Sequence, residues 1–539
     1  MTVQPIRPTR LPARAEAYVR DGLWSDQTIW NAFVCTAARH PGRTALVEGD
    51  IRLAFSDLAE RADALASGMS GLGITPGDAI AFQLPNWWET IVVLLAAARM
   101  GAVGVPVLPI HRRREVGFIL RQTGARVLVI PGRYRDCDHR ELAAALRPEL
   151  PDLAEVIVAR DPPLPGMRTL ETLHETSRAA PAPSVAPADV ALVIYTSGTT
   201  ADPKGVLHSH QTLLAEASSL APVHELADDD TVLMPSPLTH ISGIVHALLV
   251  PAALGSCAVL MPRWDATEAL RLIAAERVTY MVGAPTFLRE LAQHPSLRAA
   301  DVRSLRLFSC GGADVDPTLI AEAADRLGCV AKRVYGSTEF PTITTTGPDD
   351  PPARHLDSEG RPIGAAEVQL VGDDDAPVPV GCEGEILARG PECFLGYLDA
   401  TLNAESFTTD GWFRTGDLAT FDDAGYLRIT GRKKDIIIRK GENISARELE
   451  DLLAAHPSVA EVAVVGVPDA AAGEIACAVI RLRPGHAALS LSHLTEHLLA
   501  RGLSKRKLPE RLVIAADLPR TASGKVLKRA LRDRLAGEG

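Results

Sequence analysis

The sequence lacks the patterns that mark disulfide-stabilised and zinc-binding proteins. Its eight cysteines, at positions 35, 137, 257, 310, 329, 382, 393 and 477, form no CxxC pair and join no histidines at zinc-ligand spacing. We therefore expect reduced thiols and a cytoplasmic protein. The opening residues, MTVQPIRPTRLPAR, carry arginines but are not followed by an apolar segment, so no signal peptide is predicted.

An excess of positive charge is also missing. The formal net charge is −11, from 56 basic and 67 acidic residues, which argues against a general nucleic-acid-binding surface. Residues 243–262 are apolar over about one membrane-spanning length, but Pro251, Gly255 and His246 interrupt them. We read this stretch as a buried helix followed by a buried strand and predict no membrane span. Walker and GxGxxG patterns are absent, which argues against P-loop NTPases and dehydrogenases.

What is present indicates a large globular protein. The chain has 539 residues, 46% of them hydrophobic, enough for more than one domain. Strand-like runs such as 79–83 and 125–130 alternate with helical ones such as 89–100 and 140–146, which predicts α/β layers. Residues 162–187, rich in Pro, Ala and Ser, suggest a surface connection. From about residue 355, short strands between dense turns predict a small, mostly β subdomain.

The most informative stretch, residues 195–205, reads YTSGTTADPKG. An apolar run at 190–194 precedes it, as expected of a strand that leads into a loop. Small residues let backbone N–H groups approach an anion, hydroxyls add donors, and Lys204 adds a positive charge. Most loops of this composition are plain surface turns, so the interpretation as a phosphate loop depends on the motifs that follow it.

Four such motifs follow: YGSTE at 335–339, WFRTGD at 412–417, GRKKD at 431–435 and LPRTASGK at 518–525. Taken singly, each has an ordinary interpretation: a turn with an exposed glutamate, an aspartate that caps a turn, a solvated basic linker and an exposed lysine. An aromatic ring can also lie against a purine, and carboxylates can hold Mg²⁺ or accept hydrogen bonds from ribose hydroxyls.

In this order and at this spacing, the motifs resemble those of the acyl-adenylate-forming superfamily of acyl-CoA synthetases, adenylation domains and luciferases. The resemblance covers most of the chain. It departs at Ala201, where the family usually has glycine; if that position needs φ > 0, alanine costs about 1 kcal/mol. The implied fold is mixed α/β with a β-barrel. A large N-terminal domain of two α/β subdomains and a distorted β-barrel would span 1–431, a hinge 432–434, and a small mobile α/β C-terminal domain 435–539.

The resemblance also implies a nucleotide site. Tyr335 would lie near adenine, Thr338 near the α-phosphate, and Asp417 at the ribose, while Glu339 would hold Mg²⁺. Lys525 would separate the negative charges of the carboxylate and the α-phosphate. The implied catalytic residues are Thr196, Lys204, His240, Glu339 and Lys525. The residues implied to contact ATP or CoA are Thr196, Ser197, Gly198, Thr199, Thr200, Lys204, Gly311, Gly312, Ala313, Tyr335, Gly336, Ser337, Thr338, Glu339, Asp417, Arg432, Lys434, Lys440, Gly441 and Lys525.

An acyl pocket is implied beside residues 238–243. Its lining would be His240, Ile241, Ser242, Gly243, Ala284, Gly311, Gly336, Phe340 and Pro341. His240 would separate the pocket from the thiol tunnel, although a core histidine with a satisfied hydrogen bond is the plainer alternative. Amino-acid-activating relatives have Asp where this chain has Ile241, and a buried unpaired ammonium would cost several kcal/mol. An apolar acid is therefore predicted, aliphatic or alicyclic before aryl.

The predicted activity is that of an AMP-forming acyl-CoA synthetase that uses ATP, Mg²⁺ and CoA. Residues 439–445 resemble the loop that enters the site during thioester formation, and Lys434 would be the pivot of the domain rotation. The alternative acceptor is the phosphopantetheine of an acyl carrier protein. A non-catalytic relative would usually have lost the terminal lysine or the metal glutamate, and both are present. We expect a monomer or homodimer with no nucleic-acid partner.

Overall fold

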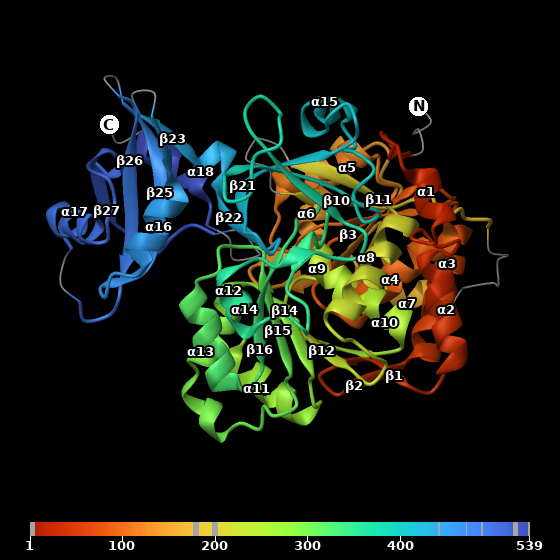
Figure 1. Cartoon of the computed structure of the whole chain (residues 1–539). Coiled ribbons are helices and arrows are strands. Elements are labelled where there is room, and N and C mark those ends of the chain that lie inside the picture. The colour runs from red at the N-terminus through yellow and green to blue at the C-terminus, as the bar shows by residue number, and fades with distance from the viewer. Residues whose placement is uncertain are drawn as a thin grey trace. The chain divides into compact units, whose positions relative to one another are not determined.

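The computed structural model describes residues 6–175, 183–196, 203–439, 442–469, 472–486, 489–520 and 526–536 (Figure 1). The chain divides into two compact units, which are described separately. Unit 1 comprises Met1–Leu356, Gly360–Glu367 and Arg389–Phe413, and unit 2 comprises Asp357–Glu359, Val368–Ala388 and Arg414–Gly539. Parallel and antiparallel sheets occur together with helices, so the predicted mixed α/β fold is confirmed.

Unit 1 contains two large sheets. The nine-stranded sheet has the order β18 (Arg361–Pro362), β17 (Thr344–Thr345), β16 (Val330–Tyr335), β15 (Leu307–Gly311), β14 (Tyr280–Gly283), β12 (Thr231–Met234), β13 (Cys257–Leu260), β1 (Thr44–Glu48), β2 (Ile51–Ala54). The seven-stranded sheet has the order β11 (Lys204–Ser209), β10 (Val190–Thr196), β4 (Val103–Pro106), β3 (Ala79–Phe82), β5 (Val127–Pro131), β8 (Glu155–Ala159), β9 (Arg168–Thr169). A small hairpin joins β6 (Arg133–Tyr134) to β7 (Cys137–Asp138).

Helices separate and cover these sheets (Figure 1). The central layer, whose core touches strands of both sheets, consists of α2 (Ile29–Arg39), α3 (Phe55–Gly71), α4 (Trp88–Met100), α8 (His210–Val223), α9 (Ile241–Ile244), the π-helical turn η2 (Val245–Leu249) and α10 (Val250–Leu254). The outer face of the nine-stranded sheet packs against α11 (Ala266–Ala275), α12 (Pro285–Ala292) and α13 (Pro317–Leu327). The outer face of the seven-stranded sheet packs against α5 (Arg113–Thr123) and α6 (His139–Leu146).

The remaining elements are short. They are α1 (Ala15–Arg20), α7 (Leu170–Glu175), α14 (Pro352–Asp357), α15 (Asn403–Ser406), η1 (Arg147–Glu149), η3 (Pro295–Ala299) and η4 (Ala400–Leu402). One of them, α7, packs into the central core.

Helix α4 shows why the central layer is so apolar. Its residues from Glu89 to Met100 are all buried, as expected of a helix enclosed on every side. At its N-terminus, the Trp88 N–H donates a hydrogen bond to Glu48 Oε2 at 2.9 Å. The helix ends at Gly101, which adopts φ +69°, a conformation that costs glycine little.

Asn86, in the loop between β3 and α4, links the two sheets of unit 1. It is buried, and its Nδ2 donates to the carbonyls of Met234, Ser236 and Met261 at 2.8–3.2 Å. Its Oδ1 accepts from the Leu238 N–H at 2.8 Å. Because both polar atoms of this amide are used, the chain that leaves β12 toward His240 is held at three backbone points, and the residue after β13 is held at a fourth.

Unit 2 contains two smaller sheets. One has the order β19 (Glu367–Val371), β20 (Gly384–Arg389), β21 (Phe413–Phe421), β22 (Leu427–Arg432). The other has the order β24 (Glu442–Ser445), β23 (Ile436–Arg439), β26 (Gly473–Leu482), β25 (Val459–Asp469), with β27 (Arg511–Ile514) also paired to β26. The helical elements are α16 (Ala446–Ala454), α17 (Leu491–Ala500), α18 (Lys528–Ala536), η5 (Lys433–Asp435) and η6 (Lys505–Lys507). Separate apolar clusters lie on the two faces of this second sheet.

Most elements expected from the sequence are present. The strands and helices predicted at 79–83, 89–100, 125–130 and 140–146 appear as β3, α4, β5 and α6. Residues 243–262 fold as buried helical turns followed by β13, and no helix among the described residues is long and apolar enough to cross a membrane. The connection expected at 162–187 instead contains β9 and α7, because Leu170 and Leu173 are buried in the central core.

The eight cysteines are unpaired. Cys35 in unit 1 and Cys382 in unit 2 are exposed, and the others are partly or fully buried. Burial raises the pKa of the Cys257, Cys310, Cys329 and Cys393 thiols to about 12.

Replacing Arg160 should destabilise unit 1. Its guanidinium binds Glu48 and Glu89 at 2.6–2.8 Å, and both carboxylates are buried. Arg160→Ala leaves two buried charges without a cation, so we expect a loss of about 3 kcal/mol in the free energy of unfolding. Burial raises the pKa of Glu89, and loss of the arginine raises it further. The deficit should therefore grow with rising pH, as the carboxylates ionise. Urea denaturation at several pH values measures it.

The matched control is Arg303→Ala, because Arg303 binds Asp301 at a surface where its side chain is 88% exposed. This change should alter stability by less than about 0.5 kcal/mol. Equal effects of the two substitutions would contradict a structural role for the buried cluster.

Candidate functional site

The predicted phosphate loop begins and ends on a hairpin. Thr196, the last residue of β10, lies opposite Lys204, the first residue of β11. The residues between them that were assigned to the nucleotide site, Ser197, Gly198, Thr199 and Thr200, lie outside the described residues. The hairpin geometry thus places the threonine and the lysine side by side at one end of the seven-stranded sheet.

The other edge of β11 is paired with residues 395–398. Leu395 and Leu398 donate backbone hydrogen bonds to Leu207 and Gly205 at 2.8 and 2.7 Å, and Leu207 donates to Gly396 at 3.1 Å. A Cβ at Gly205 would lie 3.0–3.2 Å from its neighbours on both flanking segments, so this pairing favours glycine. The segment carries Tyr397 directly to the side of the hairpin.

Tyr397 joins the lysine of the hairpin to the predicted metal ligand. Its hydroxyl donates to Glu339 Oε1 at 2.7 Å, and Lys204 Nζ lies 4.9 Å from its ring centroid, within range of a cation–π interaction. Burial, with Glu339 beside it, raises the pKa of Tyr397. The hydroxyl therefore stays protonated and orients the Glu339 carboxylate.

The loop that carries Glu339 is folded tightly on itself. A Cβ at Gly336 would lie 1.9 Å from the Pro341 carbonyl oxygen, and Ser337 N–H donates to the Phe340 carbonyl at 2.9 Å. Phe394 N–H donates to the Glu339 carbonyl at 2.9 Å. His208 Nε2 bonds the Thr338 carbonyl at 2.8 Å, and burial lowers the pKa of this histidine to about 4, so it acts as a neutral donor.

The first residues assigned to the acyl pocket, from His240 to Gly243, directly follow the turn that is hydrogen-bonded to Asn86. His240 caps α9, with Nδ1 3.0 Å from the Ser242 hydroxyl, and burial lowers the pKa of His240 to about 4. Ile241 is buried. A Cβ at Gly243 would lie 2.2 Å from the Pro237 carbonyl oxygen, so glycine is needed for the close packing of this turn.

The sheet brings the other predicted residues of unit 1 to one edge. Strands β12, β14, β15 and β16 run parallel, and the carboxyl ends of parallel strands are the usual ligand-binding edge of an α/β sheet. Ala284 follows β14, Gly311 ends β15 and Tyr335 ends β16. Gly312 and Ala313 follow Gly311, and Phe340 and Pro341 belong to the Glu339 loop.

In unit 2, two predicted nucleotide contacts bind each other. Asp417 lies opposite Arg432 across β21 and β22, and Arg432 Nε is 2.6 Å from Asp417 Oδ1. The aspartate side chain is 7% exposed and the arginine 43%. This ion pair fixes the carboxylate that was predicted to bind ribose.

The predicted pivot, Lys434, is exposed and lies between two anchored neighbours. Lys433 Nζ is 3.3 Å from Glu385 on β20. Asp435 binds Arg532 and lies 3.9 Å from Lys528, both on α18. Lys440, Gly441 and Lys525 lie outside the described residues. Arg439, the first residue of the loop predicted to enter the site during thioester formation, binds Glu510 and the Leu508 carbonyl.

Sequence reasoning missed His208, Glu216, Glu392 and the bonding role of Tyr397. No sequence signal links Tyr397 to Glu339. Glu216 and Glu392 are fully buried beside the Glu339 loop, a location that only the folded chain reveals.

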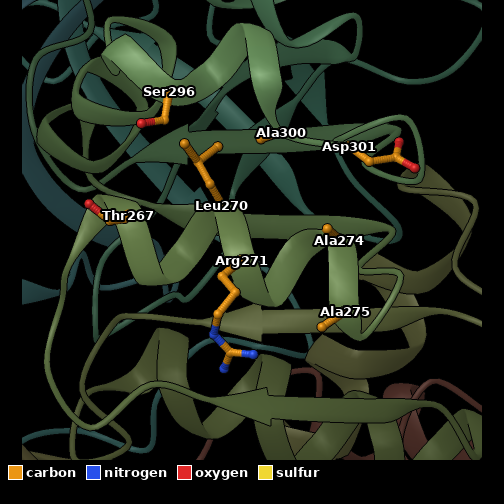
Figure 2. A pocket seen from close by; sticks show the side chains of 8 residues that line it. All are labelled: Thr267, Leu270, Arg271, Ala274, Ala275, Ser296, Ala300 and Asp301. Carbon is orange, nitrogen blue, oxygen red and sulfur yellow. The ribbon is translucent and has the colours of Figure 1, made fainter.

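Metal binding here would depend on Glu339 rather than on a protein cage. No group of three His, Cys, Asp or Glu residues in the described part of the chain could hold a metal ion. Tyr397 donates to Glu339 Oε1, and a single protein carboxylate of this kind suits a phosphate-bound Mg²⁺. The hollow of about 520 Å³ in Figure 2 is lined by α11 and residues 296–301 and contains no predicted site residue.

Comparison with known proteins shows which proteins the chain resembles. The chain is 36% identical over 524 residues to the medium-chain fatty-acid–CoA ligase of Escherichia coli K12, covering 96% of this chain and 92% of the relative. It is 34% identical to the salicyl-AMP ligase/salicyl-S-ArCP synthetase of Mycobacterium tuberculosis, with 96% and 92% covered. ATP-bound MatB from Rhodopseudomonas palustris superposes with a TM-score of 0.85 at 28% identity, with 95% and 99% covered.

Two family profiles together match most of the chain. The AMP-binding enzyme profile matches residues 33–398, which carry the β10–β11 hairpin, the Glu339 loop and Tyr397. The AMP-binding enzyme C-terminal domain profile matches residues 448–525. The chain therefore belongs to the AMP-binding enzyme family.

Proposed function

We propose that the protein is an acid–thiol ligase that activates an apolar carboxylic acid with ATP and transfers the acyl group to CoA. The observation that carries the proposal is the contact of Tyr397 with both Lys204 and Glu339. This contact joins the end of the predicted phosphate loop to the predicted metal ligand. A cation and a carboxylate held on one phenol suit a bound Mg²⁺–polyphosphate.

The first step forms acyl-AMP. A substrate carboxylate oxygen attacks the α-phosphorus of ATP, the bond to the bridging oxygen breaks, and pyrophosphate leaves. Thr196 and Lys204, with residues 197–200, bind the phosphates, and Lys525 offsets the repulsion between the two anions. Glu339 would hold Mg²⁺, and the bound ion would offset negative charge on the departing pyrophosphate.

The remaining nucleotide contacts come from three places. Residues 311–313 and Tyr335–Thr338 face the adenosine and α-phosphate, and Asp417 accepts from the ribose hydroxyls. Arg432 contacts the nucleotide while it orients the Asp417 carboxylate, a role that their 2.6 Å contact supports.

The second step forms the thioester. The CoA thiolate attacks the acyl carbonyl, the bond to the AMP phosphate oxygen breaks, and AMP leaves. We place a core at 1–431, a hinge at 432–434 and a rotating domain at 435–539, with residues 440–441 along the pantetheine arm. The anchoring of Lys433 to Glu385 and of Asp435 to Arg532 supports Lys434 as the pivot.

The acyl group is apolar, aliphatic or alicyclic before aryl. Ile241 offers no partner for a substrate ammonium, and Ala284, Gly311, Gly336, Phe340 and Pro341 add no charge. The name of the Escherichia coli relative, a medium-chain fatty-acid–CoA ligase, supports an aliphatic acid. The salicyl-S-ArCP synthetase supports the alternative, an aryl acid loaded on a carrier protein. Unpaired thiols support action in the cytoplasm.

A panel of carboxylic acids tests the function. Fatty acids from short to long, alicyclic acids, benzoates and amino acids are supplied with ATP and Mg²⁺, with and without CoA, and pyrophosphate is measured. We expect catalytic turnover with one apolar class only when CoA is present, because acyl-AMP otherwise stays bound. Turnover with a holo carrier protein but not with CoA would support the alternative acceptor. If none of the acids in the panel supported pyrophosphate release, the proposal would be refuted.

Lys525→Ala should separate the two half-reactions. Loss of a cation that acts mainly in the first transition state should slow acyl-AMP formation by about 10²–10³-fold. Thioester formation from supplied acyl-AMP should be largely unchanged. Lys505→Ala, a lysine on the exposed turn η6, is the matched control and should affect neither step. Equal losses in both half-reactions would contradict the role given to Lys525.

Glu339→Gln should weaken Mg²⁺ binding during adenylation and so raise the Mg²⁺ concentration that the reaction needs. The amide keeps the hydrogen bond from Tyr397 but is a poorer ligand for a hard cation. We expect the Mg²⁺ concentration at half-maximal pyrophosphate release to rise by about tenfold or more. Tyr397→Phe serves as the comparison, because it removes the orienting hydroxyl while keeping the carboxylate, and it should have a smaller effect. An unchanged Mg²⁺ titration for Glu339→Gln would show that the metal lies elsewhere.

A further inference from the structure

Residues near the start of the described chain contact the segment that carries Tyr397. Residues 395–398 pair with β11 and are also bound by Thr9 and Arg10. The Arg10 N–H donates to the Leu395 carbonyl at 3.1 Å. Thr9 and Tyr397 are 388 positions apart in the sequence, and the proposed reaction gives Thr9 no role. Their contact therefore needs an explanation of its own.

Thr9 and Asn403 enclose the backbone of Tyr397 in a closed ring of hydrogen bonds. The Tyr397 N–H donates to Asn403 Oδ1 at 2.9 Å. Asn403 Nδ2 donates to the Thr9 hydroxyl oxygen at 3.1 Å, and the Thr9 hydroxyl donates to the Tyr397 carbonyl at 2.7 Å. Both polar backbone groups of Tyr397 are thus bound to side chains, and each of these side chains orients the other.

The ring fits closely around Gly396, the residue before Tyr397. Gly396 adopts φ +89°, and a Cβ there would lie 2.4 Å from the Thr9 hydroxyl oxygen and 2.8 Å from Asn403 Nδ2. Glycine adopts this backbone conformation at little cost and leaves room for the two side chains. The Gly-Tyr sequence at 396–397 is therefore matched to Thr9 and Asn403.

Arg10 anchors the same N-terminal segment on two stacked aromatic rings. Its guanidinium carbon lies 3.9 Å from the Phe407 ring centroid, within range of a cation–π interaction, and the guanidinium donates to the Gly411 carbonyl at 3.2 Å. Phe407 stacks on Phe394, with ring centroids 5.0 Å apart. The Phe394 N–H donates to the Glu339 carbonyl at 2.9 Å. The N-terminal segment is thus fixed against packing that also supports the Glu339 loop.

The position of the Tyr397 backbone matters because the side chain is bound at its far end. The hydroxyl donates to Glu339 Oε1 at 2.7 Å, and Lys204 Nζ lies 4.9 Å from the ring centroid. Hydrogen bonds weaken steeply when they are stretched or bent. A small displacement of the Tyr397 backbone would therefore change the orientation of the Glu339 carboxylate.

We propose that Thr9 and Asn403 are positioning residues for adenylation, which fix the backbone of Tyr397 and, through its hydroxyl, the Glu339 carboxylate. The effect on adenylation rests on the proposed function, whereas the fixed backbone can be measured independently of it. Both residues act through Tyr397 and not on the substrate.

Thr9→Val removes the hydroxyl and nearly keeps the shape of the side chain. We expect the Mg²⁺ concentration at half-maximal pyrophosphate release to rise by about threefold, no more than in Tyr397→Phe, because one hydrogen bond to the Tyr397 backbone is lost. The KM for the acid should change by less than about twofold. Thr9 contacts Tyr397, Leu395 and Asn403, which lie outside the residues assigned to the acyl pocket.

Three further variants distinguish positioning from a general loss of structure. Thr9→Ser keeps the hydroxyl and should titrate with Mg²⁺ like the wild-type protein. Thr318→Val, the same change at an exposed threonine of unit 1, is the matched control and should have no effect. In the double variant Thr9→Val/Tyr397→Phe, loss of the Thr9 hydroxyl should add nothing to the effect of Tyr397→Phe, because the tyrosine hydroxyl through which it acts is gone.

Hydrogen–deuterium exchange tests the fixed backbone without any activity. The Tyr397 N–H is bound to Asn403 and the Leu398 N–H to the Gly205 carbonyl. In Thr9→Val, a peptide that covers residues 394–398 should exchange about fivefold faster than in the wild-type protein, because local opening becomes easier. In Thr318→Val its exchange should be unchanged.

The outcomes separate this inference from the proposed function. If no acid supports pyrophosphate release, the proposed function fails, and the exchange rates still decide whether Thr9 fixes the Tyr397 backbone. Unchanged exchange in Thr9→Val would overturn the inference. Faster exchange with an unchanged Mg²⁺ titration, equal losses in Thr9→Ser and Thr9→Val, or additive losses in the double variant would refute the positioning role. If Thr9→Val does not fold, Asn403→Ala, which breaks the ring from its other side, decides by the same measurements.

Discussion

The site of unit 1 depends on one backbone pairing, that of residues 395–398 with the free edge of β11. The pairing joins parts of the chain that lie almost two hundred positions apart in the sequence. It places Tyr397 between Lys204 and Glu339. A second link between β11 and the Glu339 loop is the bond between His208 and the Thr338 carbonyl. Backbone hydrogen bonds in a sheet are insensitive to side-chain identity, so the surrounding residues can vary while this contact persists.

Buried polar groups select a single packing register in this protein, which apolar packing alone cannot do. The central helical layer would pack against the two sheets in many registers, because apolar contacts have little directionality. Asn86 selects one register by bonding four backbone groups around β12 and β13. Arg160 fixes a further place by binding Glu48 and Glu89. Each cluster is satisfied by several partners, which is the condition under which buried polarity specifies a fold.

The sequence allowed the elements and the positions of the motifs to be predicted, because both depend on local patterns. Strand β5 and helix α4 follow from runs of apolar residues, and Gly336 follows from the YGSTE motif. Contacts between distant segments could not be predicted in this way. The bond from Tyr397 to Glu339 and the burial of Glu392 depend on long-range pairing, which leaves no periodic signal. Residues 170–173 were mistaken for a loop because their two buried leucines are surrounded by polar residues.

The distribution of thiols has a practical consequence for following motion in solution. Cys35 and Cys382 are the two exposed cysteines, one in each unit, and the other six are partly or fully buried. Alkylating reagents attack accessible thiolates first. A donor and an acceptor fluorophore could therefore be attached to the unmodified protein, one on each unit. Because both cysteines lie within residues 1–431, the energy transfer between them should stay constant while residues 435–539 rotate as proposed, which makes this pair an internal reference that needs no engineered labelling site.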